Sequence, residues 1–230
     1  MNNIVLSSAT IGVVISLLAY QLGVFLKAKT KKAIFNPLLI SIALVIVFLL
    51  VFQIKYESYN QSAKYLSYLL TPATVSLAIP LYQQLDLLKK NWVAVVLGIT
   101  SGVLTSLLSV LLMSVLFKLS HAEYITLLPK SITTAIGMGI SEELGGYPTI
   151  TVAVIIVTGI FGNMISEGFC KLFRIQHPIS KGLAIGTSSH AMGTTKALEM
   201  GQIEGAMSSL SIVVAGLMTV VLASFFAMFY

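Results

Sequence analysis

Long apolar stretches separated by short charged segments run through the whole sequence. Six of them contain no charged residue, at residues 4–26, 38–54, 65–85, 91–117, 147–166 and 205–230. A helix that crosses a bilayer needs about 20 predominantly apolar residues, and most of these stretches reach that length. The pattern predicts an all-α polytopic membrane protein with about six transmembrane helices.

The composition agrees with this class. The chain is 57% hydrophobic and only 10% charged, and its mean hydropathy is +0.94, whereas soluble domains are about 25% charged. Such a chain cannot cover its surface with polar groups, so the lipid bilayer is its expected surroundings. No positive residue precedes the first apolar stretch, which argues against a cleaved signal peptide.

Positive charges gather in three of the connections between apolar stretches. They are Lys27, Lys29, Lys31 and Lys32 after the first stretch, Lys89 and Lys90 after the third, and Lys171, Arg174 and Lys181 after the fifth. Cationic loops stay in the cytoplasm, so six alternating spans place both termini outside the cell. The net charge of +6 therefore reports orientation, and we expect no nucleic-acid partner.

Two further segments, residues 131–143 and 183–199, are too short and too rich in Gly, Ser and Thr for ordinary spans. A full crossing by residues 131–143 would place Lys171 and Arg174 outside, against the charge rule. We therefore predict two broken or re-entrant segments, each returning to the side that it left. The first enters from outside and the second from the cytoplasm.

The two segments also resemble each other. At a constant offset of 56 residues they match at Ser131 and Thr187, Ala135 and Ala191, Gly137 and Gly193, Glu143 and Glu199, and Gly145 and Gly201. Each is followed by a long apolar helix, and the two helices are expected to run in opposite directions. This is the pattern of an inverted repeat, which secondary transporters use to place broken helices near the bilayer midplane. We predict a two-helix scaffold unit at residues 1–64 and a transport-like unit at residues 65–230.

Polar side chains are concentrated in these two segments. Hydroxyl, imidazole and ammonium groups are costly in hydrocarbon, so they are expected to line a wet pocket, where half-helix N-termini favour an anion. The predicted substrate-binding residues are Ser131, Thr133, Thr134, Ser188, Ser189, His190, Thr194 and Lys196.

Several of these groups have alternative roles. His190 can accept a proton near neutral pH, or it can be a structural histidine. Lys196 and Lys130 can hold an anion or extend towards the interface. Glu143 and Glu199, at equivalent repeat positions, couple protons or pair with basic neighbours. Asn163 bonds across helices or reaches the pocket. Lys130, Glu143, Asn163 and Glu199 are accordingly predicted as proton-coupling or structural residues.

Enzyme chemistry has no support in the sequence. No metal-ligand spacing, nucleophile motif or phosphate-binding loop is present, and Cys170 is the single cysteine. We therefore expect no catalytic residues, metal or cofactor.

Several motifs resemble the LrgB/CidB family over essentially the whole chain. They are LTPAT at 70–74, AIPLY at 78–82, LLPKSITTA at 127–135, KGLAIGTSSH at 181–190 and KALE at 196–199. The resemblance implies a bacterial plasma membrane and two competing functions. Bacterial members are described as holin-like or antiholin-like regulators of murein hydrolase activity and autolysis, acting with a small LrgA/CidA-type partner. Plant relatives are associated with glycolate and glycerate exchange, and bacterial members with pyruvate.

We therefore expect a transporter of a small monocarboxylate, coupled to protons and linked to autolysis. It is expected to act as a homodimer, because a small moving unit needs a fixed scaffold. The alternative is an antiholin-like regulator without carrier activity.

Overall fold

The computed structural model of the protein describes residues 10–30 and 35–230. Within these residues the chain is helical and has no strands. Four helices are long and apolar enough to cross a membrane, namely Ile11–Thr30 (α2), Trp92–Phe117 (α8), Pro148–Leu172 (α11) and Gln202–Phe226 (α13). The protein is thus an all-α polytopic membrane protein, as the sequence predicts. Residues 4–9 of the first predicted span, and Lys31 and Lys32, lie outside the described residues.

The other two predicted spans differ from the expectation. Residues 38–54 form the 15-residue helix Pro37–Val51 (α3). Residues 65–85 are divided among the helices Lys64–Leu69 (η1), Leu70–Ser76 (α5) and Ala78–Gln83 (α6). Pro72 and Pro80 lie in this stretch, and each lacks the N–H that a continuous helix would use.

The chain folds as two compact units, one ending at Ser76 and the other comprising Leu77–Tyr230. In the first unit, α2 packs against α3 and against Tyr56–Ala63 (α4). Gly12 N donates to Ser62 Oγ at 3.0 Å. The Asn36 side chain caps α3 by accepting from Leu38 N and Leu39 N, which satisfies two N–H groups at the start of the helix. The scaffold and transport-like roles of the two units stay predictions.

The contacts between helices of the second unit show at which of its two opposite ends each helix begins. It contains α6, Leu85–Lys90 (α7), α8, His121–Leu127 (α9), Thr134–Glu143 (α10), α11, Pro178–Met200 (α12), α13 and Ala227–Phe229 (η2). A Cβ on Gly102 would lie 2.5 Å from Thr187 Cγ2, and one on Gly98 would lie 3.1 Å from Leu183 Cδ1. Helices α8 and α12 therefore begin at the same end.

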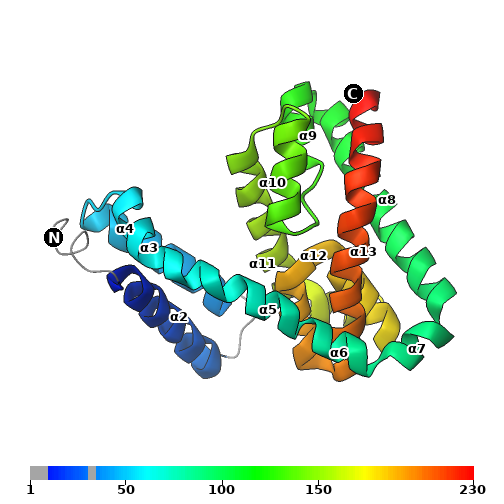
Figure 1. Ribbon diagram of the computed structural model, residues 1–230, viewed down its shortest axis with the longest axis horizontal. Helices are drawn as coiled ribbons and strands as arrows, with labels where there is room; N and C mark the ends of the chain where they lie inside the picture. The colour runs from blue at the N-terminus through cyan, green and yellow to red at the C-terminus, as the bar shows by residue number, and fades with distance from the viewer. Residues whose placement is uncertain (1–9, 31–34) are drawn as a thin grey trace. The chain divides into compact units, whose positions relative to one another are not determined.

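Residues 121–143 form a hairpin at the opposite end, where the C-terminus lies (Figure 1). The hydroxyl of Tyr124 in α9 donates to the carbonyl of Phe226 at 2.9 Å. Thr151, near the start of α11, donates to Thr126 O and Ser141 Oγ, on the two arms, at 2.9 and 2.7 Å. Helix α9 enters, the chain turns through residues 128–133, and α10 returns to the same side.

Helix α12 is a second hairpin, because its backbone breaks at His190, with φ 42° and ψ −139°. Before the break it runs parallel to α13, with Gly182 against Glu204 and Gly186 against Ser208. After the break it runs back, with the Thr194 and Ser208 hydroxyl oxygens 2.7 Å apart. Ser208 thus contacts both arms, and residues 178–200 return to the end where they began.

The two hairpins share one packing contact at equivalent positions. A Cβ on Gly137 would lie 3.3 Å from Pro129 O, and one on Gly193 would lie 3.1 Å from Ile185 O. Gly193 follows Gly137, and Ile185 follows Pro129, at the offset of 56 residues seen in the sequence. In each hairpin, a glycine on the second arm lets it approach the backbone of the first.

Candidate functional site

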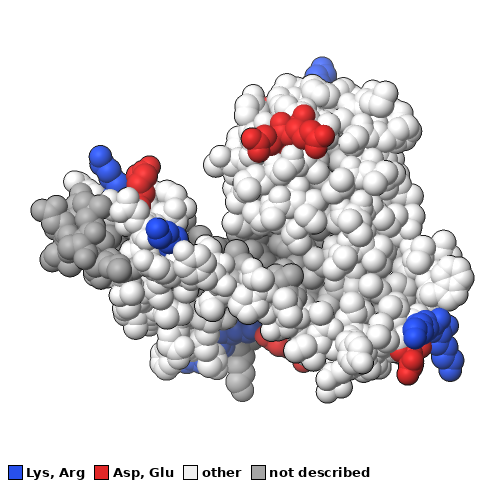
Figure 2. All heavy atoms as spheres, viewed as in Figure 1, with Lys and Arg blue, Asp and Glu red and all other residues white. Residues whose placement is uncertain are grey.

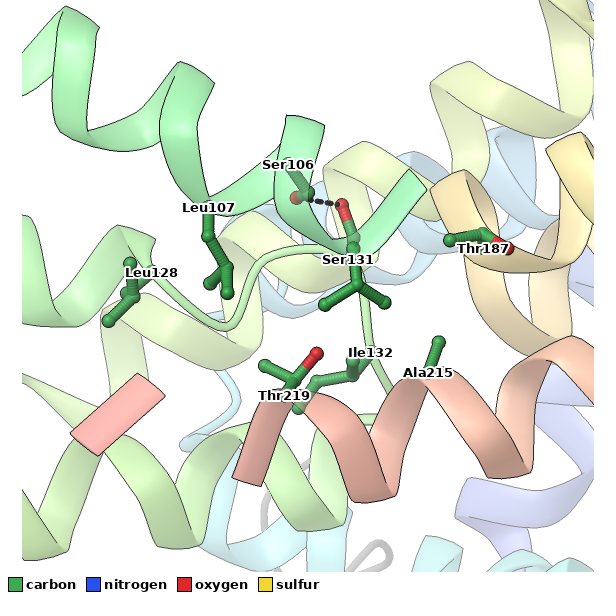
Figure 3. A pocket seen from close by; sticks show the side chains of 9 residues that line it. Ser106, Leu107, Leu128, Ser131, Ile132, Thr187, Ala215 and Thr219 are labelled. Atoms are coloured by element: carbon green, nitrogen blue, oxygen red, sulfur yellow. Dashed lines mark hydrogen bonds between the residues drawn. The ribbon is translucent and has the colours of Figure 1, made fainter. Parts of the chain in front are cut away.

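The tips of the two hairpins meet at a small cavity in the second unit (Figure 3). The first hairpin contributes Leu128, Ser131 and Ile132, and α12 contributes Thr187. The remaining lining residues are Val103, Ser106 and Leu107 of α8 and Ala215 and Thr219 of α13. The cavity has about 10 Å³ of space, which is room for about one water molecule. The two segments that the sequence singles out thus line one site.

Two serines of the cavity lining form a hydrogen-bonded cluster with Lys130, which itself lies outside the lining. Lys130 Nζ donates to Ser131 Oγ at 2.9 Å and to Ser106 Oγ at 3.3 Å. Ser106 Oγ in turn donates to Ser131 Oγ at 3.0 Å, as Figure 3 shows. Ser131 is buried, and Lys130 and Ser106 are half-buried. The ammonium group is held by hydroxyls of the hairpin tip and of α8.

Lys130 has no carboxylate partner within the described part of the chain. The ion pairs found there join Lys171 to Glu167 and Lys196 to Glu167 and Glu199. The ammonium group of Lys130 has only neutral hydroxyl partners among the described residues, so an anion brought to it would gain a charge-assisted hydrogen bond.

His190 lies at the break of α12 and is buried. Its Nε2 lies 3.0 Å from Ile155 O of α11, and because a carbonyl oxygen can only accept, Nε2 carries the hydrogen. No hydrogen bond to Nδ1 is found among the described residues. A Cβ on Gly159 would lie 2.7 Å from the ring. The ring is thus fixed, with one nitrogen left to accept a proton.

The other hydroxyls predicted to bind substrate mostly support the hairpins. Thr194 is fully buried and donates to His190 O at 2.9 Å. Ser189 packs on Gly162 of α11, and the exposed Ser188 bonds Ile185 O and Ser189. Of the eight predicted ligands, only Ser131 lines the cavity.

Thr133 and Thr134 lie at the start of α10. Thr133 is the N-cap residue, without a side-chain capping bond, and Thr134 is the first residue of the helix. Both are half-buried, next to the tip but outside the cavity lining.

Lys196 lies on the second arm of α12, away from the hairpin tip. Its Nζ is 3.0 Å from Glu167 Oε2 and 3.2 Å from Glu199 Oε2. Asn163 also ties α11 to this arm, since its Nδ2 donates to Met192 O at 2.7 Å and to Thr195 Oγ1 at 2.9 Å. This geometry favours the structural alternatives for Lys196, Glu199 and Asn163.

Glu143 is the last residue of α10 and is exposed. Figure 2 shows acidic atoms at the α9–α10 end of the second unit, whereas the lysines of α7 mark the other end. Glu143 and Glu199 thus lie at the outer ends of their hairpins, away from the cavity.

A larger, open depression of about 540 Å³ lies where α11 ends and α12 begins. Its lining includes the cations Lys171, Arg174, Lys181 and Lys196 and the acids Glu167 and Glu199. Across residues 10–30 and 35–230, no group of three or more His, Cys, Asp or Glu side chains is placed to hold a metal ion.

Sequence reasoning missed three hydroxyl residues of the cavity, Ser106, Thr187 and Thr219. Thr187 is part of the polar segment, and its repeat position opposite Ser131 is a usable signal. Ser106 is one of several serines in an apolar span, and nothing in its sequence neighbourhood distinguishes it. Ser101 and Ser109 donate to carbonyls of their own helix, whereas the Ser106 hydroxyl bonds to Ser131 and Lys130 of the first hairpin.

Comparison with known proteins gives one consistent result. The LrgB-like family model matches residues 16–229. The chain is 41% identical over 219 residues to a protein of Bacillus cereus strain B4264 named "Antiholin-like protein LrgB", covering 95% of both chains. A protein of the same name from Bacillus anthracis strain CDC 684 / NRRL 3495 is equally similar. No solved structure matches the chain.

Proposed function

The chain belongs to the LrgB-like family, and we propose that it is a membrane carrier for a small monocarboxylate of the pyruvate or glycolate type. The proposal rests on the second unit, where two broken-helix hairpins enter from opposite ends and line the same cavity. Irregular backbone survives at membrane depth only where it is packed in protein or lines a path for polar solutes. Paired hairpins of this kind surround the solute site of secondary transporters.

The size of the cavity requires movement during transport. About 10 Å³ is too small for a carboxylate with its carbon skeleton. In this conformation the tips and helices α8 and α13 close the site. Separation of one hairpin from its surroundings would open the cavity to one side, and separation of the other hairpin would open it to the other side. The two-fold arrangement of the hairpins suits such alternating access.

Proton coupling is assigned to His190. The ring is positioned by Ile155 O and retains an Nδ1 that can take up a proton. A protonated imidazole would add a positive charge at the break of α12, and the positive charge would favour an anion held between the hairpins, so solute and proton would favour each other's binding.

The positive-inside rule gives the orientation that we propose. Helix α7, which carries Lys89 and Lys90, leads into the start of α8, and the start of α12 lies at the same end. Lys171, Arg174 and Lys181 surround the start of α12. This end would face the cytoplasm of the bacterial cell, and the α9–α10 end and the C-terminus would face outside.

A second candidate function is that of an antiholin-like regulator acting with a small LrgA/CidA-type membrane partner, without carrier activity. The name of the relatives, "Antiholin-like protein LrgB", favours it. On the carrier account, an effect on autolysis follows indirectly from altered carboxylate and proton balance. A homodimer is part of the carrier proposal, since the moving hairpins need a fixed frame.

The two functions differ in what the purified chain does alone. In proteoliposomes, the carrier account expects saturable counterflow of labelled pyruvate or glycolate that needs no second protein. Absence of any saturable flux, together with non-selective conductance once an LrgA/CidA-type protein is added, would establish the regulator instead.

A further inference from the structure

We infer that Lys130, Ser131 and Ser106 form the binding site for the carboxylate group of the transported solute. This inference rests on the proposed carrier function and assigns its anion site to residues of the first hairpin and of α8. The site predicted from the sequence also included Lys196 and the hydroxyls of the second hairpin, which this assignment leaves out.

The hydrogen bonds within the cluster use only some of its protons, and two remain available to a ligand. The ammonium carries three protons and each hydroxyl carries one. Three of these five protons are used by the bonds from Lys130 to Ser131, from Lys130 to Ser106 and from Ser106 to Ser131. Within the described residues, one proton of Lys130 and the proton of Ser131 have no acceptor. Two adjacent donors match the two oxygens of one carboxylate.

The positive charge of the cluster also calls for an anionic partner. Lys130 is the cation of the hairpin tip, and no described carboxylate lies within ion-pairing distance of it. Removing a charge from water without a partner costs several kcal/mol. An anionic ligand supplies the missing partner, whereas a neutral or cationic solute does not.

Lys196 is the natural comparison, because it lies on the other hairpin and carries the same charge. Its ammonium already contacts Glu167 and Glu199. An incoming anion there would compete with two carboxylates, so Lys196 is the poorer anion ligand.

The rest of the cavity lining indicates the polarity of the solute that the opened site would take. Thr187 donates its hydroxyl to Leu183 O of its own helix at 2.7 Å. The neighbouring lining residues Val103, Leu107 and Ile132 are apolar. Once the hairpins separate, these walls would contact the short carbon body of a solute. Lys130 lies outside the lining and bonds to the lining residues Ser106 and Ser131, and this single ammonium group would pair with a single carboxylate.

The test compares the lysine and serine variants in reconstituted pyruvate counterflow. Lys130→Met removes the charge and should raise KM for pyruvate about ten- to a hundred-fold, the range for a lost hydrogen bond to a charged group. Ser131→Ala and Ser106→Ala should each raise it by a smaller factor. Lys130→Arg keeps the charge and should recover part of the affinity. Lys118→Met, at an exposed position after α8, is the matched control and should leave KM unchanged.

The outcomes separate this inference from the carrier function. Saturable flux in the wild type with an unchanged KM in Lys130→Met overturns the inference and leaves the carrier standing. No flux in the wild type overturns the carrier itself. If Lys130→Met does not fold, as judged by gel filtration, the two serine variants decide, and unchanged KM in both also overturns the inference.

Discussion

The Lys130 ammonium nitrogen lies 2.9 Å from the hydroxyl oxygen of Ser131, at the tip of a hairpin whose two arms return to the same end of the second unit. Ser131 shares its cavity with Thr187, which occupies the equivalent position in the sequence repeat. The two hairpins therefore meet at their corresponding residues. This relationship connects the repeat in the sequence to a single site with one uncompensated positive charge.

Lys196 provides a direct contrast with Lys130. Its ion pairs with Glu167 and Glu199 involve partly exposed side chains, and such pairs contribute up to about 1 kcal/mol. We expect Lys196→Met to change KM for pyruvate by less than about five-fold. Counterflow measured beside Lys130→Met checks this, and a larger KM effect at Lys196 than at Lys130 would reverse the assignment.

His190 should control the pH dependence of transport. His190→Gln keeps an N–H that can donate to Ile155 O but removes the group that accepts a proton. We expect the variant to lose the stimulation of uptake by an inward proton gradient while retaining pyruvate exchange. Uptake measured across a series of external pH values tests this. His177→Gln, just before the first residue of α12, serves as control, and a wild-type pH profile in His190→Gln would remove the coupling role.

Gly137 and Gly193 should be equally sensitive to enlargement. A Cβ on Gly137 would lie closest to the Ile155 side chain of α11 and then to Pro129 O, and one on Gly193 would lie closest to Ser189 and Ile185. Gly137→Val and Gly193→Val therefore both overpack their sites. Overpacking of this kind typically costs about 1–3 kcal/mol. Thermal unfolding in detergent should show a lowered midpoint for both.

The control for these two substitutions lies close by in sequence. A Cβ on Gly139 meets nothing within 4 Å, so Gly139→Ala should leave the midpoint unchanged or raise it. A midpoint lowered as much in Gly139→Ala as in Gly137→Val would show that the hairpin contact is not the cause.

The predicted segments 131–143 and 183–199 fall within the hairpins at residues 121–143 and 178–200, and the reason is local. The polar residues of 131–143 and 183–199 cannot face lipid, and the repeat of Gly137 and Gly193 fixes how the arms pack. The same pattern predicts a break within residues 183–199, but it does not indicate that the break falls at His190.

The roles of the charged residues are harder to predict, because they depend on distant partners. Lys196 forms an ion pair with Glu167, which lies on another helix, and the sequence around Lys196 does not indicate this pairing. Lys130 meets Ser106 across the unit, and Ser106 is one of several serines in an apolar helix. Likewise, the boundary between the two units falls after Ser76, because the stretch predicted as one span at residues 65–85 is divided into short helices.

The orientation of the hairpins can be checked with introduced cysteines. In a Cys170→Ser background, Glu143→Cys should react with a membrane-impermeant maleimide added outside intact cells. Glu199→Cys, at the base of the other hairpin, should react only after the cells are permeabilised. Labelling of both positions from the same side would contradict the inverted arrangement.

Cross-linking of the two tips tests the central claim most directly. Ser131→Cys and Thr187→Cys place one thiol on each hairpin at the shared cavity, and a short bifunctional thiol reagent that is cleaved by reductant can join them. The carrier account expects the cross-link to abolish the pyruvate counterflow that the untreated double variant shows in proteoliposomes, and reduction to restore it. Each single variant, compared with its own untreated sample, should lose less flux after the same treatment. Complete cross-linking with undiminished counterflow would contradict the claim that solute passes between the hairpins.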